Sequence, residues 1–513
     1  MNNMDDHRDS QSKLAHEHFI IPALLALSTV LAFAFLFPYL GKVPGLNGDE
    51  AWLGLTVSDI LTGHHPLCGL RFYTGPLHYY FLAPFLQGFG RTVGVLRVFT
   101  AITSVISVGV YFLVLRRLFG AMSAALAVLL LVSSPWFVMY GRTAWAFLAL
   151  APVLSLTSLY FFLHALDCRG RARWRWMVLA VVTLALGVWN HLLLLTLPAV
   201  LLVFTLFFLR ERQTRVITAL YALAGGALGI IPHLWCGSID SGSEWASFLY
   251  TSSVGFFSRV MEWPWLFLRI IQGDVLFLRF TGEVVSPGSI VNVLFFILAI
   301  SYAFVRAWRE GARKTAVYQS LLIGFISVFF VTLSVSPGNS ERYFLLPLYF
   351  VPLILSLFFL GIMRRLRWQR SLWIIVGIFV AFNSMRIVRN YFMAYLASGG
   401  KSAQFYVGSM PETTYHVVRS QKLYSVLIDV GAKRIVTNFL IGMPLKFYDI
   451  EGKRFDAVDV RDGFPRGLVE RLSPGTYAVT YPDQVHRDAV SAHPELELIF
   501  EEEDFLIYKA REF

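Results

Sequence analysis

Apolar residues gather in long runs through the first 390 residues of the chain, and short polar stretches separate these runs. A run of roughly 17–25 apolar residues is long enough to cross a bilayer as an α-helix. About eleven runs reach or approach this length: 19–40, 93–115, 121–140, 143–166, 174–189, 192–209, 216–235, 289–306, 316–335, 343–363 and 371–390. The pattern predicts an α-helical polytopic membrane protein, in which 174–189 and 192–209 fit the required length least well.

Basic residues occupy alternate loops between these runs. Lys and Arg resist translocation and collect on the cytoplasmic side of a membrane. Five loops hold 17 of the 30 Lys and Arg before residue 395 and only three acids: 116–117, 167–175, 210–215, 306–314 and 364–370. The N-terminus is therefore expected inside the cell and the C-terminus outside. The segments then expected to face the exterior are Asp49-Glu50, Arg142, Asn190-His191, the loop 236–288 and Glu341-Arg342.

The character of the chain changes near residue 395. Short apolar runs of strand length at 434–439, 476–480, 496–500 and 505–508 are separated by turn signals such as Ser473-Pro474-Gly475. The segment 423–430 is typical of a helix that ends at Gly431. We expect a multi-span part at 1–394, with exterior helices next to the membrane, and a small exterior α/β domain at 395–513.

Composition and charge agree with this division. The chain has 56% hydrophobic residues and a mean hydropathy of +0.60, well above a soluble domain. The net charge of +11 resolves into +14 for 1–394 and −3 for 395–513. The positive charge therefore reports topology beside an anionic inner leaflet, and it requires no nucleic acid as a partner. No cleavable signal peptide is expected before the first apolar run.

Two further features belong to the exterior side. Within 236–288, the segment 264–280 combines Trp, Phe and Arg, as helices that lie in a membrane interface do. Cys68 and Cys236 are the cysteines placed outside, whereas Cys168 falls inside. Three cysteines at these spacings make no disulfide framework, so two unpaired exterior thiols are the expectation.

The paired acids Asp49 and Glu50 are the strongest indication of chemistry. They follow the first apolar run and precede a segment that is typical of a helix from Ala51 to Leu61. Acids in the first turn of a helix are also stabilised by the helix dipole, and Asp49 in that case caps the helix. Capping and catalysis are compatible.

Several stretches in a fixed order resemble the GT-C superfamily of integral-membrane glycosyltransferases. The resemblance is to the bacterial group that uses polyprenyl-phosphate sugars, including aminoarabinose transferases to lipid A and protein O-mannosyltransferases. The matching stretches are Gly48-Asp49-Glu50-Ala51-Trp52, the segment 73–90 that begins Tyr73-Thr74-Gly75-Pro76, Arg97, the segment 116–120, the segment 134–142 that ends in Arg142, and the segment 341–347 that begins Glu341-Arg342-Tyr343.

The resemblance implies an enzyme of the bacterial inner membrane. It transfers a hexosyl- or pentosyl-type sugar from a polyprenyl-phosphate donor to a lipid, glycan or protein acceptor at the exterior face. Because the phosphate is already a stable leaving group, the acceptor hydroxyl is the group that needs a base. Asp49 is the candidate base, Glu50 orients it or binds the acceptor, and the transfer inverts the anomeric carbon.

Arginines are the candidates for binding the donor phosphate, since a guanidinium fork matches phosphate oxygens. Arg342 and Arg142 lie at exterior ends of spans, where snorkelling is the competing explanation. Arg97 lies inside a span, where an arginine faces protein or a polar cavity. Tyr73, His78 and Tyr343 complete the predicted substrate-binding set.

The cofactor requirement stays open. His78, His191 and His233 fall on the exterior side and together with Asp49 or Glu50 offer donors for a divalent metal. Their spacing is no ligand signature, so structural histidines are the preferred interpretation and the sequence assigns no metal ligand.

A transporter or flippase of lipid-linked sugars is the alternative function. It also needs exterior arginines and an interfacial cleft. Transporters commonly carry inverted repeats or paired broken helices, and the sequence shows neither.

Overall fold

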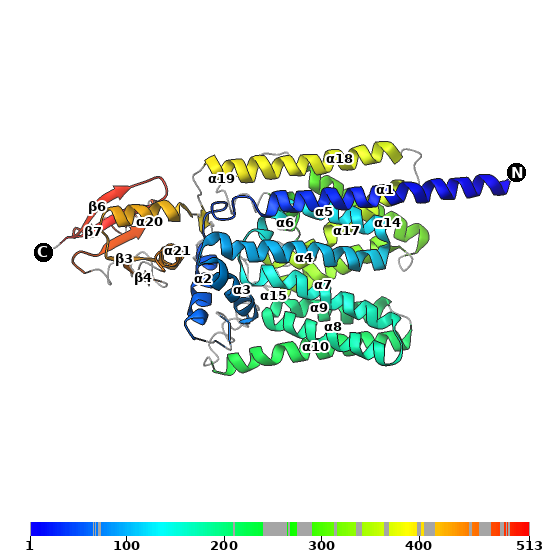
Figure 1. Cartoon of the computed structure of the whole chain (residues 1–513), viewed down its shortest axis with the longest axis horizontal. Helices are drawn as coiled ribbons and strands as arrows, with labels where there is room; N and C mark the ends of the chain where they lie inside the picture. The colour runs from blue at the N-terminus through cyan, green and yellow to red at the C-terminus, as the bar shows by residue number, and fades with distance from the viewer. Residues whose placement is uncertain are drawn as a thin grey trace.

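The computed structural model describes residues 2–511 except 65, 67, 70–72, 209–210, 240–263, 265–266, 274–289, 312–314, 335–340, 364–368, 398–401, 405–415, 451–453, 461–472, 483–486, 489 and 491–492. Most helices run side by side as a bundle, and a small domain containing β-strands lies at one end of it (Figure 1). The chain begins at the opposite end.

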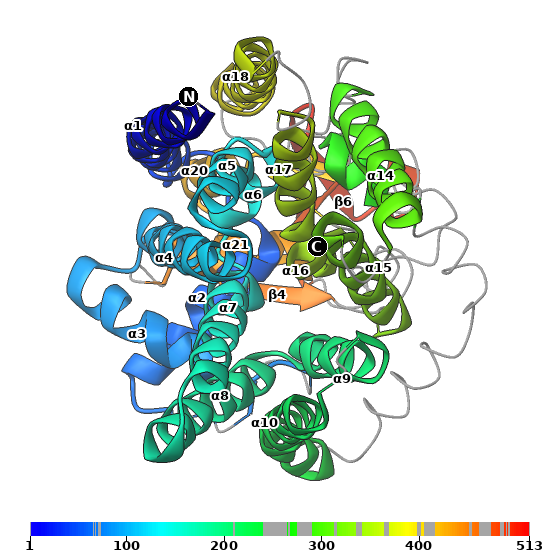
Figure 2. The same cartoon turned by 90° about the vertical axis from the view of Figure 1, so that its right-hand side faces the viewer.

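The apolar runs form the bundle. Its helices are α1 (Asn2–Leu36), α4 (Val93–Phe119), α5 (Ala121–Val132), α6 (Pro135–Gly141), α7 (Ala146–Asp167), α8 (Gly170–Asn190), η1 (Leu192–Leu195), α9 (Thr196–Phe208), α10 (Arg212–Ile239), α14 (Ile290–Glu310), α15 (Ala316–Ser334), η4 (Glu341–Phe344), α16 (Leu345–Leu348), α17 (Phe350–Met363), α18 (Gln369–Arg386), η5 (Ile387–Met393) and α19 (Ala394–Ala397). Seen along the bundle, they surround a core of α5, α6 and α17 (Figure 2).

All eleven expected spans are helical. Among the described residues, eight helices are long and apolar enough to cross a membrane. The other three expected spans correspond to a bent pair and to two shorter apolar helices, Leu192–Val203 and Ala316–Val328. The segment 174–189, which fitted the length least well, lies within a 21-residue helix.

The bent pair is the run 121–140, which forms two helices at 68° to each other, α5 and α6. Pro135 is the first residue of α6 and Ser134 before it is extended, with φ −80° and ψ 128°. Proline restricts the preceding residue to extended conformations and lacks an N–H, so a continuous helix through this point is unfavourable. The expected straight span is therefore broken.

Two helices lie at the end of the bundle that carries the small domain: α2 (Gly48–Leu61) and α3 (Leu77–Phe89) (Figure 1). The chain between them pairs with the end of α8, because Thr74 and His191 form an isolated bridge and the Gly75 amide donates to the carbonyl of Asn190 at 3.0 Å. Side chains from α2, α3 and α4 share one apolar cluster here.

A disulfide joins Cys68 to Cys236 at this end, with a Cα–Cα distance of 5.7 Å. The expectation of two unpaired thiols is therefore wrong. The two residues are 168 positions apart, and only the folded arrangement of the α2–α3 connection beside the end of α10 brings them together. Cys168 is free.

The C-terminal part is the predicted mixture of helices and strands. Its elements are β1 (Ser402–Gln404), β2 (His416–Val418), α20 (Ser420–Asp429), β3 (Arg434–Asn438), α21 (Phe439–Tyr448), β4 (Asp456–Val460), β5 (Tyr477–Thr480), β6 (Leu496–Glu501) and β7 (Leu506–Ala510). The predicted helix at 423–430 is the second part of α20, and Gly431 has the positive φ of +70° that favours glycine at a helix end. Elements β1, β2, β4 and α21 were not predicted.

The five-stranded sheet has the order β4-β3-β5-β7-β6. Strand β3 is parallel to β4 and β5, whereas β7 is antiparallel to both β5 and β6. Helix α21 packs on α2, and its residues Met443 and Phe447 join the apolar cluster of α2, α3 and α4. The C-terminal part is thus docked on the bundle.

The interfacial segment expected at 264–280 falls mostly outside the described residues. Its described residues 267–272 are helical, and Phe267, Ile270 and Ile271 are buried in the bundle core. These side chains contact protein.

Candidate functional site

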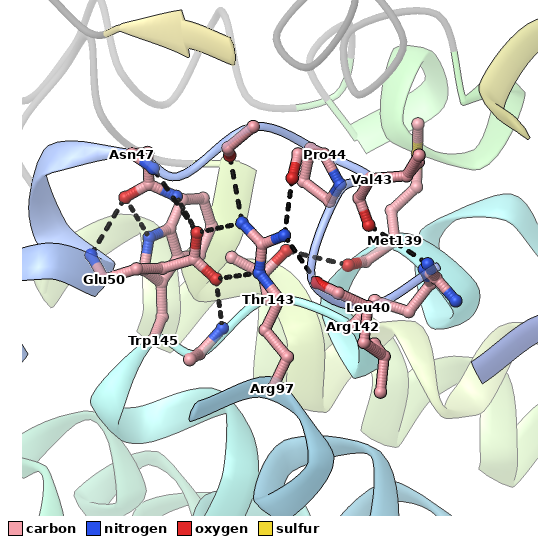
Figure 3. Close-up of polar contacts among 12 residues, drawn as sticks. Leu40, Val43, Pro44, Asn47, Glu50, Arg97, Met139, Arg142, Thr143 and Trp145 are labelled. Atoms are coloured by element: carbon pink, nitrogen blue, oxygen red, sulfur yellow. Dashed lines mark hydrogen bonds and ion pairs between the residues drawn. The ribbon is translucent and has the colours of Figure 1, made fainter. Parts of the chain in front are cut away.

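Glu50 is fully buried, and hydrogen bonds engage both of its carboxylate oxygens (Figure 3). Arg97 forms an ion pair with it: Nε donates to Oε1 at 2.9 Å and an η nitrogen donates to Oε2 at 2.6 Å. The amide of Ala144 donates to Oε1 at 2.7 Å. Each member of this buried pair therefore compensates the charge of the other.

The Glu50 carboxylate also takes part in capping the N-terminus of α2. Asn47 caps this helix: its Oδ1 accepts from the Glu50 amide at 3.0 Å, and its Nδ2 donates to Oε2 of Glu50 at 2.9 Å. This is a capping box, in which the cap and the third helical residue satisfy each other's backbone. The capping residue is thus Asn47, and the idea that Asp49 caps the helix is wrong.

Arg97 also holds the loop between α1 and α2. Its η nitrogens donate to the carbonyl of Leu40 at 3.0 Å, to that of Gly45 at 2.9 Å, and to that of Pro44. The side chain is fully buried. As expected for an arginine inside a span, it faces protein.

Arg142 holds the end of α1 and the loop that follows it. Its η nitrogens donate to the carbonyls of Phe35 and Leu36 at 2.8 and 3.0 Å, at the C-terminal end of α1, and to that of Pro38 at 2.6 Å. They also donate to the carbonyl of Val43 at 3.0 Å (Figure 3). Helix ends leave carbonyls without intrahelical partners. The guanidinium also lies over the ring of Phe392, 4.7 Å from its centroid. Arg142 is fully buried.

Together these residues form what we call the arginine bracket: Glu50, Arg97, Arg142 and the segment 35–47 that they hold. Arg97 lies on α4, Arg142 directly follows the end of α6, and Glu50 lies on α2. Because each arginine bonds several carbonyls of the loop, the start of α2 has one position relative to α4 and α6. The bracket therefore fixes where Asp49 stands.

Asp49 is adjacent to Glu50 in the chain but differs from it in exposure. It lies in the first turn of α2 and is half-buried, whereas Glu50 is inaccessible. The two acids were predicted as a pair from the sequence, but in the structure their side chains have different environments. Asp49 remains the predicted base.

A row of aromatic rings connects three loops at this end. The ring of His191 lies 5.5 Å from that of Tyr73 and 5.9 Å from that of Tyr343. Nδ1 of His191 accepts from the Leu193 amide at 3.0 Å. Two predicted substrate-binding residues, Tyr73 and Tyr343, are thus brought together by a histidine that the sequence did not place among them. The backbone of Arg342 belongs to η4, but its side chain lies outside the described residues.

His78 is fully buried beside Phe99, with 5.3 Å between ring centroids. Burial lowers the pKa of His78 to about 3, because an apolar environment disfavours the charged ring. Within the described part of the chain, neither ring nitrogen has a hydrogen-bond partner. The ring is therefore neutral at physiological pH.

The histidines do not gather with acids as a metal site. Nε2 of His233 contacts the carbonyl of Val188 at 2.9 Å, and His78 and His191 have the separate environments given above. Among the residues that the structure describes, no three His, Cys, Asp or Glu side chains lie close enough together to hold a metal ion.

The C-terminal domain reaches the bracket through α21. Burial raises the pKa of Tyr448 to about 12, partly offset by the nearby charge of Arg97. A methyl group on Gly54 of α2 would lie 2.3 Å from the ring of Phe447. The close approach of the two helices thus depends on a glycine.

An apolar cavity of about 530 Å³ lies inside the bundle. Helices α4, α7, α9, α15 and α17 line it, with side chains such as Leu115, Leu159, Val200, Ile323 and Leu353. Tyr349 also contributes to the lining, and its hydroxyl contacts Oγ of Ser107 at 3.0 Å. This cavity could not be predicted from the sequence, because its lining residues resemble any other lipid-facing or core residues.

Part of the chain matches a known protein family. Residues 65–236 match a family model described as dolichyl-phosphate-mannose-protein mannosyltransferase. A comparison with curated protein sequences gives no significant match.

Solved structures show the same fold over nearly the whole chain. ArnT from Cupriavidus metallidurans is similar in its apo state, with a TM-score of 0.59 at 15% identity, and bound to undecaprenyl phosphate, with 0.57 at 16%. Each comparison covers 96% of this chain and 98% of the other. The apo oligosaccharyltransferase from Archaeoglobus fulgidus has a TM-score of 0.53 at 13% identity, covering 90% of this chain and 69% of the other. The chain has the fold of the GT-C membrane glycosyltransferases, which confirms the resemblance seen in the sequence.

Proposed function

We propose that the protein transfers a sugar from a polyprenyl-phosphate donor to an acceptor hydroxyl at the exterior face of the bacterial inner membrane. The observation that carries this proposal is the position of Asp49, a half-buried acid that the arginine bracket fixes beside the inaccessible Glu50. The fold shared with a protein solved with undecaprenyl phosphate supports the class of donor.

The reaction is a single displacement. Asp49 accepts the proton of the acceptor hydroxyl, whose oxygen forms a bond to the anomeric carbon of the sugar. The bond between that carbon and the phosphate oxygen breaks, and the electron pair leaves with the phosphate as polyprenyl phosphate. Attack from the opposite side inverts the anomeric carbon.

The bracket residues act in this scheme by position. Hydrogen bonds engage the Glu50 carboxylate and the η nitrogens of Arg97 and Arg142 within the protein. A guanidinium that binds several carbonyls has to give up those bonds before it binds a phosphate. We therefore assign Glu50, Arg97 and Arg142 to holding α2, and retain Arg342 as the candidate phosphate ligand and Tyr73 and Tyr343 as candidate substrate-binding residues.

The apolar cavity suits the isoprenoid part of the donor. Its lining is mostly aliphatic and aromatic, and it lies between membrane helices. An isoprenoid chain fits such a lining because it has no polar group that burial would leave unpaired. The acceptor is then a lipid such as lipid A, another glycan, or a protein.

Asp49→Asn tests the base. This change keeps the shape of the side chain and removes its proton affinity, so sugar transfer should fall by roughly 10²–10⁴-fold. Asp59→Asn is the matched control, because Asp59 lies on the same helix but is exposed. Equal transfer rates for the Asp49→Asn variant, the Asp59→Asn variant and the wild type would show that Asp49 is a solvated acid.

A further inference from the structure

The topology of the C-terminal sheet draws attention to the carboxyl ends of its central strands. Strand β3 lies between β4 and β5 and is parallel to both. The chain leaves β3 through α21 to reach β4 on one side, and β5 lies on the other side. Ligands of open α/β sheets bind outside the carboxyl ends of strands at such a reversal of strand order. In this sheet that point is between the ends of β3 and β5.

The last residues of these two strands are both polar. Val436 of β3 is paired with Ala478 of β5, and Asn438 and Thr480 each lie two positions further on, so both are on the same face of the sheet as that pair. A hydrogen bond from Oγ1 of Thr437 to the Val479 carbonyl, at 2.9 Å, keeps the strands together here.

Both side chains are buried, and each has a polar atom that forms no hydrogen bond with the described residues. Asn438 is 5% exposed and Thr480 is inaccessible. In the part of the chain that the structure describes, Nδ2 of Asn438 and Oγ1 of Thr480 have no hydrogen-bond partner. Buried polar groups are nearly always paired, and one left unpaired destabilises the fold. Two adjacent ones therefore indicate a ligand.

Helix α21 begins directly after Asn438. Oδ1 of Asn438 accepts from the Ile441 amide at 2.9 Å, so the Nδ2 end of the same group stands at the first turn of this ten-residue helix. Backbone amides at a helix N-terminus carry partial positive charge and favour anions.

We infer that the carboxyl ends of β3 and β5 bind the phosphate group of a small or lipid-borne ligand through Nδ2 of Asn438, Oγ1 of Thr480 and the first-turn amides of α21. All of these groups donate hydrogen bonds, and phosphate oxygens accept them. The site belongs to the C-terminal domain and is independent of the proposed transfer reaction. Free phosphate and phospholipid headgroups both present this chemistry.

Two isosteric changes test the site. Asn438→Asp keeps an oxygen to cap α21 but replaces the donor by a negative charge, and Thr480→Val removes the hydroxyl at nearly constant volume. Gln421→Glu is the control, because it adds the same charge at an exposed position of the same domain. Thermal unfolding of the full chain is measured in detergent against inorganic phosphate, with chloride at equal ionic strength as reference.

Phosphate should raise the unfolding temperature of the wild type and of the Gln421→Glu control. Each site variant should bind phosphate about 10-fold or more weakly, as expected for one lost hydrogen bond to a charged group. A parallel arm compares nanodiscs of phosphatidylglycerol with nanodiscs of a phosphate-free galactolipid. A response in that arm alone, lost in both variants, identifies a lipid headgroup as the ligand.

Two results would contradict the phosphate site. If neither arm stabilises the wild type, or if the variants respond like the wild type, the site binds no phosphate. In that case Thr480→Val should simply raise the unfolding temperature, because it removes an unpaired hydroxyl. Sugar transfer is unaffected by this outcome, so the two proposals fail separately.

Discussion

The difference between Asp49 and Glu50 rests on which atoms each carboxylate meets. Glu50 is bonded to Arg97, Asn47 and Ala144, residues that lie up to 94 positions away along the chain. A sequence shows that two acids are adjacent but not which one is buried. The prediction that Arg97 faces protein could be made from its place in an apolar run, whereas its partners could not.

Glu50→Gln should destabilise the protein. It leaves the Arg97 charge buried without its counter-charge, which costs about 3–5 kcal/mol when one partner of a buried pair is removed. Thermal unfolding in detergent measures the effect, with Asp59→Asn as an exposed control expected to change stability by less than about 0.5 kcal/mol. Adding Arg97→Met to Glu50→Gln should recover part of the loss. Wild-type stability with weakened donor binding would instead place Glu50 and Arg97 in the substrate site.

At the scale of elements, the membrane helices could be predicted from apolar length alone, because the bilayer imposes that length. The break at Pro135 follows from local stereochemistry, although the run 121–140 was expected as one span. Helix α21 was missed because its apolar residues satisfy two partners, the sheet of its own domain and α2. A helix that packs against two partners has no single polar face, so its sequence lacks the amphipathic pattern by which a helix is predicted.

Gly54→Ala should loosen the docking of α21 on α2. The added methyl group meets the ring of Phe447 at 2.3 Å, and overpacking of this kind costs about 1–3 kcal/mol. Phe447→Leu in the same protein should restore part of the stability. Gly88→Ala in α3 is the control: nothing lies within 4 Å of the added group, and alanine favours a helix by up to about 1 kcal/mol. Equal unfolding temperatures for Gly54→Ala and Gly88→Ala would show that the two helices are not in firm contact.

For the whole molecule, one end of the bundle carries α2, the disulfide, the aromatic row and the C-terminal domain. The alternation of basic loops predicts that this end is outside the cell, and a disulfide is most stable in an oxidising compartment.

A reporter that is active only outside the cytoplasm, fused after Phe513, should therefore be active. The same reporter fused after Phe119, at the opposite end of α4 from Arg97, should be silent. Reversed activities would place Asp49 on the cytoplasmic face and contradict the orientation.

Sugar transfer is tested most directly with the purified protein in detergent. The protein is incubated with a panel of labelled polyprenyl-phosphate sugars and candidate acceptors, and both labelled acceptor and released polyprenyl phosphate are measured. At least one donor should give both products in equal amounts. A protein that is inert toward every donor in detergent, yet moves the labelled lipid-linked sugars across sealed vesicles, would be a transporter and would contradict the account.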